Sequence, residues 1–152
     1  EEFEQMIQEG ELIEYAQYVN HYYGTPKDYV QRQLEQGKDV ILEIEIQGAL
    51  KVKEAYPDTL LLFVSPPSAE ELKDRLVGRG TEEESVIDMR LSRAWQEAQG
   101  VENYDYFVIN DDLSECVQQV HSIIQNEHAR VGKNQVLIET IRTELKRFAK
   151  GE

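Results

Sequence analysis

Two segments and one upstream carboxylate hold the residues whose types are best suited to chemistry. The segments are Asn20-His21-Tyr22-Tyr23-Gly24-Thr25 and Leu42-Glu43-Ile44-Glu45-Ile46-Gln47-Gly48. Glu14 precedes both of them, inside a stretch typical of a strand. Phenol and hydroxyl groups donate hydrogen bonds to phosphate oxygens, and carboxylates accept them from ring N–H groups. The set therefore indicates a pocket that reads a purine base and holds its phosphate.

The carboxylates indicate which base such a pocket would read. A guanine edge presents an N1–H and an exocyclic amine, and one carboxylate accepts both, whereas adenine offers an acceptor at N1. Glu14 is one candidate for this contact, and Glu45 is a second because we expect it to end a buried strand. Tyr23 would donate to a phosphate oxygen, and Thr25 would donate to the base carbonyl. The alternative places Glu14, Glu43 and Glu45 on solvent faces of strands and uses the tyrosines for packing.

Three arginines form a second group, Arg75, Arg79 and Arg90. Arg75 and Arg79 are one helical turn apart, and Arg79 lies between two glycines. Guanidinium groups beside a flexible turn suit a lid over transferring phosphates, because phosphoryl transfer needs charge neutralisation and exclusion of water. The alternative is a salt-bridged surface, since acidic residues flank these arginines on both sides.

The elements that must position these groups follow from the spacing of apolar residues. Helical spacing predicts helices that end at Gly10 and Gly37, and further helices over 47–56, 68–77, 82–99, 113–131 and 136–148. Strand patterns cover 12–19, 40–45, 59–64 and 104–109, and the last three are typical of buried strands. Thr25 is the expected N-cap of the helix that ends at Gly37, with Pro26 at its first position.

Strands that alternate with helices predict an α/β fold, with a parallel sheet and helices on both faces. Residues 11–26 break the alternation and are expected to form a small antiparallel insert. A chain of 152 residues is large enough for one domain with its own core, so we expect a single domain over residues 1–152.

The overall composition limits the classes of partner. A formal charge of −14 disfavours general binding to nucleic acid or to anionic membranes. Cys116 is the only cysteine, so no internal disulfide forms, and we expect a reducing, cytoplasmic location. No apolar run approaches the length of a membrane span. The histidines lack metal-ligand spacing with one another or with Cys116, so no metal site is predicted among them.

The motifs together resemble the guanylate kinase family, over essentially all 152 residues. The resemblance rests on Ile13-Glu14-Tyr15-Ala16, Tyr22-Tyr23-Gly24-Thr25, Leu42-Glu43-Ile44-Glu45-Ile46-Gln47-Gly48, Pro66-Pro67-Ser68, Arg75-Leu76-Val77-Gly78-Arg79-Gly80-Thr81 and Val108-Ile109-Asn110-Asp111-Asp112. Each motif alone is weak, and their common order and spacing make the set specific. The resemblance implies a P-loop-kinase-type fold and phosphoryl transfer from ATP to GMP, giving ADP and GDP. It also implies Mg²⁺ bridging the ATP phosphates.

The resemblance also implies roles for individual residues. Guanine contacts fall on Glu14, Thr25 and Glu45, and the contact to the GMP phosphate falls on Tyr23. An acidic position near the metal and phosphates falls on Glu43, lid and catalytic arginines within residues 75–90 fall on Arg75, Arg79 and Arg90, and a loop beside the adenine falls on Asn110 and Asp111. Glu45 departs from many relatives, which carry Asp there, so its reach toward guanine differs.

The P-loop motif G-x-x-x-x-G-K-[ST] does not occur in these 152 residues. By comparison with the family, we expect that the chain begins downstream of its natural start and lacks the first inner strand of the sheet. Such a sheet has an unpaired edge. We therefore expect this polypeptide to have little kinase activity, and robust formation of ADP from ATP and GMP would contradict that expectation.

Two alternatives remain at this point. A non-catalytic guanylate-kinase-like module would keep the fold, erode the nucleotide site and bind protein partners. The retained guanine set and arginines favour an enzyme over that module. Another nucleoside monophosphate kinase conflicts with carboxylates suited to guanine, and titration with GMP and AMP separates these cases. The pattern does not assign an oligomeric state.

Overall fold

The protein was analysed as a computed structural model that describes residues 2–18, 21–78, 80 and 83–149. The chain divides into two compact units. The first comprises Glu1–Phe63 and Arg75–Phe107, and the second comprises Val64–Asp74 and Val108–Glu152. None of the described helices has the length and apolar character needed to cross a membrane. The single domain over residues 1–152 stays a prediction.

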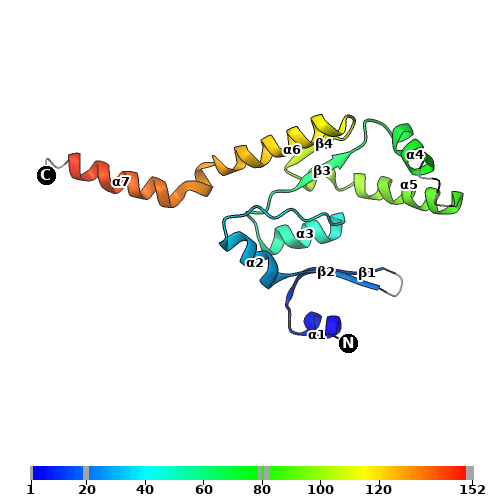
Figure 1. Cartoon of the computed structure of the whole chain (residues 1–152), viewed down its shortest axis with the longest axis horizontal. Helices are drawn as coiled ribbons and strands as arrows, with labels where there is room; N and C mark the ends of the chain where they lie inside the picture. Colours follow the sequence, from blue (N-terminus) through cyan, green and yellow to red (C-terminus); the bar gives the residue numbers. More distant parts are fainter. Residues whose placement is uncertain (1, 19–20, 79, 81–82, 150–152) are drawn as a thin grey trace. The chain divides into compact units, whose positions relative to one another are not determined.

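Helices and strands alternate over much of the chain (Figure 1). In chain order they are α1 (Glu2–Gln8), β1 (Leu12–Tyr18), β2 (His21–Pro26), α2 (Lys27–Glu35), α3 (Ile46–Ala55), β3 (Leu62–Ser65), α4 (Ala69–Gly78), α5 (Glu84–Ala98), η1 (Val101–Asn103), β4 (Tyr106–Ile109), α6 (Leu113–His128), η2 (Val131–Asn134) and α7 (Gln135–Ala149). The two sheets within the described residues are β1–β2 and β3–β4. The α/β class predicted from the sequence is confirmed.

The β1–β2 hairpin is the expected antiparallel insert. Its register places Glu14 opposite Thr25 and Ala16 opposite Tyr23. Because side chains alternate along a strand, Tyr23 and Thr25 share one face of β2. Phe3 of α1 stacks on Tyr22, with ring centroids 5.3 Å apart, and thereby covers the opposite face. The hairpin lies between α1 and α3, and both helices contact β1 (Figure 1).

The ends of two helices match the predicted glycine stops. Gly10 follows α1 with φ 68°, and Gly37 follows α2 with φ 73°. Positive φ values cost little only for glycine, so these residues end the helices without strain. The predicted cap at Thr25 is wrong, because the helix begins one residue later, with Pro26 at the N-cap and no side-chain cap bond. Thr25 instead belongs to β2 and uses its hydroxyl within the hairpin.

The predicted strand over residues 40–45 is not formed. A strand needs a neighbour that pairs with its backbone, and the two sheets of the described residues do not include this segment. Exposure nevertheless alternates along it: Val40, Leu42 and Ile44 are half-buried, while the residues between them are exposed. The segment therefore packs one side against the protein as a strand would, but in the described residues its backbone pairs with no other strand.

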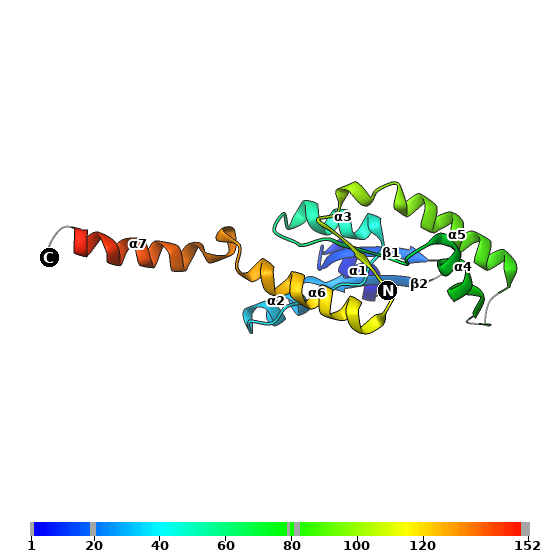
Figure 2. The same cartoon turned by 90° about the horizontal axis from the view of Figure 1, so that it is seen from above.

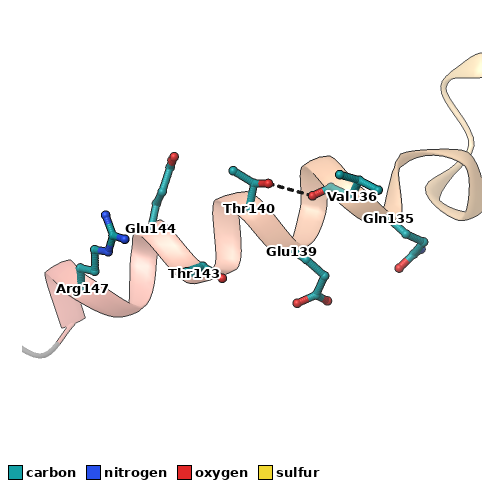
Figure 3. Close-up of a pocket in the computed structure, with 7 residues that line it drawn as sticks. All are labelled: Gln135, Val136, Glu139, Thr140, Thr143, Glu144 and Arg147. Carbon is teal, nitrogen blue, oxygen red and sulfur yellow. Dashed lines mark hydrogen bonds between the residues drawn. The ribbon is translucent and has the colours of Figure 1, made fainter.

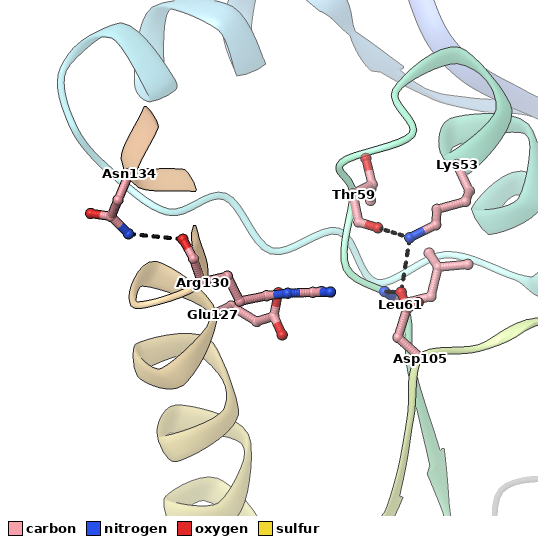
Figure 4. Close-up of polar contacts among 7 residues, drawn as sticks. All are labelled: Lys53, Thr59, Leu61, Asp105, Glu127, Arg130 and Asn134. Carbon is pink, nitrogen blue, oxygen red and sulfur yellow. Dashed lines mark hydrogen bonds and ion pairs between the residues drawn. The ribbon is translucent and has the colours of Figure 1, made fainter. Parts of the chain in front are cut away.

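The strands β3 and β4 form the parallel sheet. The carbonyl of Leu61 accepts from the N–H groups of Asp105 and Tyr106, and the carbonyl of Ser65 accepts from Asn110, so both strands run in the same direction. The carboxylate of Asp105 closes the start of this pair, accepting from Leu61 N–H at 2.8 Å and from Lys53 Nζ at 3.0 Å (Figure 4). Lys53 also donates to the carbonyl of Thr59, and α3 is thereby tied to the sheet.

Burial of these strands on both faces was predicted and is wrong. Val64 of β3 is exposed, and Val108 is the only residue of β4 that is buried, at 0% exposure. Each strand has one neighbour in a two-stranded sheet, so few layers are available to cover it.

In the second unit, α6, η2 and α7 follow one another along the chain. Asp112 caps α6 by accepting from Glu115 N–H at 2.9 Å. At the other end, the amide of Asn134 donates to the carbonyl of His128 and to that of Arg130, the second bond being drawn in Figure 4. These bonds hold η2 against the end of α6. Cys116 and Ile123 of α6 are buried.

Candidate functional site

Glu14 is the one buried polar or charged residue among the described residues, with 8% of its surface exposed. Its Oε1 accepts a hydrogen bond of 2.8 Å from the hydroxyl of Thr25, its partner across the hairpin. Within the described part of the chain, Oε2 receives no hydrogen bond. A buried carboxylate is costly unless donors satisfy it. Oε2 is therefore an acceptor for which a bound molecule could supply the donor.

Helix α3 approaches this carboxylate closely. A Cβ atom built on Gly48 would lie 3.2 Å from Oε2 of Glu14 and 3.5 Å from Cδ1 of Ile44. Figures 1 and 2 show α3 beside the hairpin, and this contact places the first turn of the helix next to Glu14. The Glu14 carboxylate is therefore enclosed by Thr25 on β2 and by Gly48 on α3.

Tyr23 lies on the same face of β2 as Thr25, two residues away, and is 60% exposed. Two residues along a strand correspond to about 7 Å. The phenol is thus an accessible donor along the strand from the buried carboxylate. A base at Glu14 and a phosphate at Tyr23 would extend along one face of the hairpin.

Glu45 does not end a strand, because it is the N-cap residue of α3. Its side chain is 54% exposed and forms an ion pair with Arg93 of α5, and Arg93 also pairs with Glu97 at 3.2 Å. A depression of about 460 Å³ surrounds this pair; it is lined by Glu45, Ile46, Gln47, Met89, Ser92, Arg93, Gln96 and Glu97. Glu43 lies in the preceding extended segment and is exposed. Glu43 and Glu45 are thus exposed, as the alternative expected, but neither lies on a strand, and Glu14 is buried.

Charge in this depression also affects Tyr104. Burial raises the pKa of the Tyr104 phenol above its ordinary value, and the negative charge of Glu97 raises it further. Both causes disfavour the phenolate. Tyr104 also packs edge-on against Phe63, with ring centroids 5.2 Å apart, so it behaves as a packing residue.

The arginine group is described only in part. Arg75 is half-buried in the last turn of α4, and Arg90 is exposed on α5. Arg79 lies outside the described residues, so its position relative to a phosphate stays a prediction. Asn110 and Asp111 belong to the second unit, directly after β4, where the backbone of Asn110 bonds Ser65.

A second depression runs along α7 and does not form a site. Its lining residues, drawn in Figure 3, are Gln135, Val136, Glu139, Thr140, Thr143, Glu144 and Arg147. All of them come from one helix, and the hydroxyl of Thr140 is bonded to the carbonyl of Val136. A single convex helix supplies only one wall, so a ligand would remain open to water on its other sides.

Two residues at the site were not predicted from the sequence. Arg93 carries no motif signal, and its partner Glu45 becomes apparent only when α3 and α5 are placed in space. Gly48 did carry a signal, because a glycine inside a predicted helix is a poor helix former and often marks a close approach.

Comparisons with known proteins identify the family. A family model described as Guanylate kinase matches residues 1–127. The chain is 52% identical over 130 residues to the guanylate kinase of Oceanobacillus iheyensis, covering 86% of this chain and 63% of that protein. It is 49% identical over 144 residues to that of Caldanaerobacter subterraneus subsp. tengcongensis, covering 95% of this chain and 70% of the relative.

A solved structure gives the same result for the fold. The crystal structure of guanylate kinase from Anaplasma phagocytophilum matches with a TM-score of 0.71 and 29% sequence identity, over 87% of this chain and 64% of that one. The α/β fold with its antiparallel hairpin is thus that of a solved nucleotide kinase. The chain belongs to the guanylate kinase family. It spans 63% of the length of the Oceanobacillus relative.

Proposed function

We propose that this chain binds GMP and belongs to an enzyme that transfers a phosphoryl group from ATP to GMP. The observation that carries the proposal is the buried Glu14, whose Oε1 is held by Thr25 and whose Oε2 has no donor among the described residues. Guanine supplies the N–H donors that such a carboxylate needs. Adenine presents an acceptor at N1, which would face the negative charge.

Thr25 supports this contact in a way that differs from the sequence-based expectation. A hydroxyl has one proton to donate, and in this structure Thr25 donates it to Glu14. Thr25 therefore fixes the orientation of the carboxylate, and donation to the base carbonyl would require that bond to break. We propose that Glu14 reads the base and that Thr25 holds Glu14.

Tyr23 is the exposed donor on the same face, and we propose that it binds the GMP phosphate, while Arg75, Arg79 and Arg90 stabilise the group in transfer. Asn110 and Asp111 would lie beside the adenine, and Glu45 would add a guanine contact after leaving Arg93. These roles come from the family resemblance and await the same tests.

We propose that the nucleotide carries most of the ligands of a bound Mg²⁺ ion. The described residues hold no cluster of three or more His, Cys, Asp or Glu side chains suited to a metal ion. Mg²⁺ usually keeps several waters and binds through substrate phosphates and one or two carboxylates. The exposed Glu43 is the carboxylate that we propose near it. Bound there, Mg²⁺ would neutralise charge on the phosphates.

Isothermal titration of this chain with GMP and with AMP tests the proposal without requiring turnover. We expect GMP to bind about 100-fold more tightly than AMP, since the carboxylate makes charge-assisted bonds to guanine only. IMP, which lacks the exocyclic amine, should bind with intermediate affinity.

Equal affinity for GMP and AMP would contradict the reading of Glu14, and tighter binding of AMP would indicate another nucleoside monophosphate kinase. No binding of either nucleotide would favour the protein-interaction module. The buried Glu14–Thr25 pair argues against that module, because a site released from nucleotide binding has no reason to keep an unsatisfied buried carboxylate.

A further inference from the structure

The glycine at the start of α3 is not explained by its backbone. Gly48 lies inside a helix, where alanine is the better helix former, and its φ is not in the left-handed region. Any requirement for glycine at this position therefore lies in its surroundings. Its nearest neighbour is Oε2 of Glu14, which would lie 3.2 Å from an added Cβ, while Cδ of Glu14 would lie at 3.7 Å.

The two oxygens of Glu14 have different surroundings. Oε1 is occupied by the Thr25 hydroxyl, whereas Oε2 faces Gly48 and accepts no hydrogen bond from the described residues. A methyl group at position 48 would fill the space next to Oε2, at a distance tighter than ordinary van der Waals contact. The carboxylate would have to shift by a few tenths of an ångström, and this shift would disturb its alignment with Thr25 or with a bound base.

We propose that Gly48 is a positioning residue for Glu14 and thereby sets the specificity for guanine. This inference rests on the proposed function, since it assumes that Glu14 reads the base. Gly48 leaves space next to Oε2 on the side of α3, and Thr25 fixes Oε1 from β2. Oε2 is then oriented to accept a hydrogen bond from guanine. Gly48 itself makes no contact with the nucleotide in this scheme.

The test is Gly48→Ala, with Gly132→Ala in η2 as the matched control, because a Cβ at Gly132 meets no atom within 4 Å. We expect Gly48→Ala to weaken GMP binding about tenfold by titration calorimetry, roughly the loss of one bond to a charged group. AMP binding should change less than twofold. The midpoint of urea unfolding should stay unchanged or rise, because alanine favours the helix. The control Gly132→Ala should change neither the affinity for GMP, nor the affinity for AMP, nor the urea midpoint.

A double-mutant cycle with Glu14→Ala separates this inference from the proposed function. Without the carboxylate, Gly48→Ala should raise the urea midpoint more than it does in the native background, and this coupling is measured with no nucleotide present. If the two substitutions change the urea midpoint additively, the positioning role is overturned even if GMP binds as proposed. If the midpoints couple but GMP does not bind, the positioning role stands and the proposed function is wrong. Unchanged GMP affinity in Gly48→Ala would overturn the link to specificity.

Discussion

Replacing Glu14 by glutamine weakens GMP binding by about 10- to 100-fold, which is the expected loss for hydrogen bonds to a charged acceptor. The amide keeps the size of the carboxylate, and its oxygen can still accept from Thr25. Its NH₂ group then replaces Oε2 and faces the N–H groups of guanine, donor against donor. Titration calorimetry of the variant with GMP measures the effect.

The same substitution should leave AMP binding unchanged or slightly improved, because an amide N–H can donate to N1 of adenine. Glu35→Gln, on the exposed surface of α2, is the control that changes the same charge away from the site. If both substitutions lower GMP affinity equally, the effect is one of overall charge, and Glu14 does not read the base. Equal losses for GMP and AMP would lead to the same conclusion.

Replacing Gly24 by alanine destabilises the hairpin by about 1–3 kcal/mol, the usual range for an overpacked site. A Cβ at this position would lie 2.9 Å from the carbonyl oxygen of Glu14 and 2.9 Å from Cζ of Phe3. The phenyl ring of Phe3 can move, but the carbonyl belongs to the backbone of β1 and can move only if the strands separate. Urea unfolding followed by circular dichroism measures the loss.

Gly24→Ala should also weaken GMP binding, because position 24 directly precedes Thr25 and the added methyl group would displace the backbone of Glu14. Gly132→Ala, in open space, is the control for the loss of a glycine. An unfolding midpoint equal to that of the native chain would contradict this prediction, because both Phe3 and the Glu14 carbonyl would then have moved without cost. The hairpin would then be less tightly packed against α1 than its distances indicate.

The sequence was sufficient to predict features that depend on neighbours along the chain. The hairpin from Leu12 to Pro26 and the helix stops at Gly10 and Gly37 follow from local patterns. Such features rest on spacing, turn chemistry and periodicity, all of which can be read directly from the sequence. The bond between Glu14 and Thr25 was not predicted, although both residues were placed in one insert.

Features that depend on distant partners were not predictable in the same way. Residues 40–45 have the apolar content of a strand, but a strand also requires a neighbour for its backbone. Glu45 was expected at the guanine edge, yet it pairs with Arg93, which no spacing rule connects to it. The role of Gly48 depends on where α3 crosses β1. These outcomes follow from tertiary packing, which overrides local preference.

The cross-strand bond between Glu14 and Thr25 closes a loop of only 11 residues, whereas the bond from Leu61 N–H to Asp105 closes one of 44. Chain entropy makes the longer closure costlier by about 1 kcal/mol. The proposed base-reading pair is thus inexpensive in conformational entropy, because it is encoded within a short continuous stretch. Pairing of β3 with β4 loses more conformational entropy. The ion pair between Lys53 and Asp105 and the hydrogen bond from Leu61 N–H to Asp105 help to offset this loss.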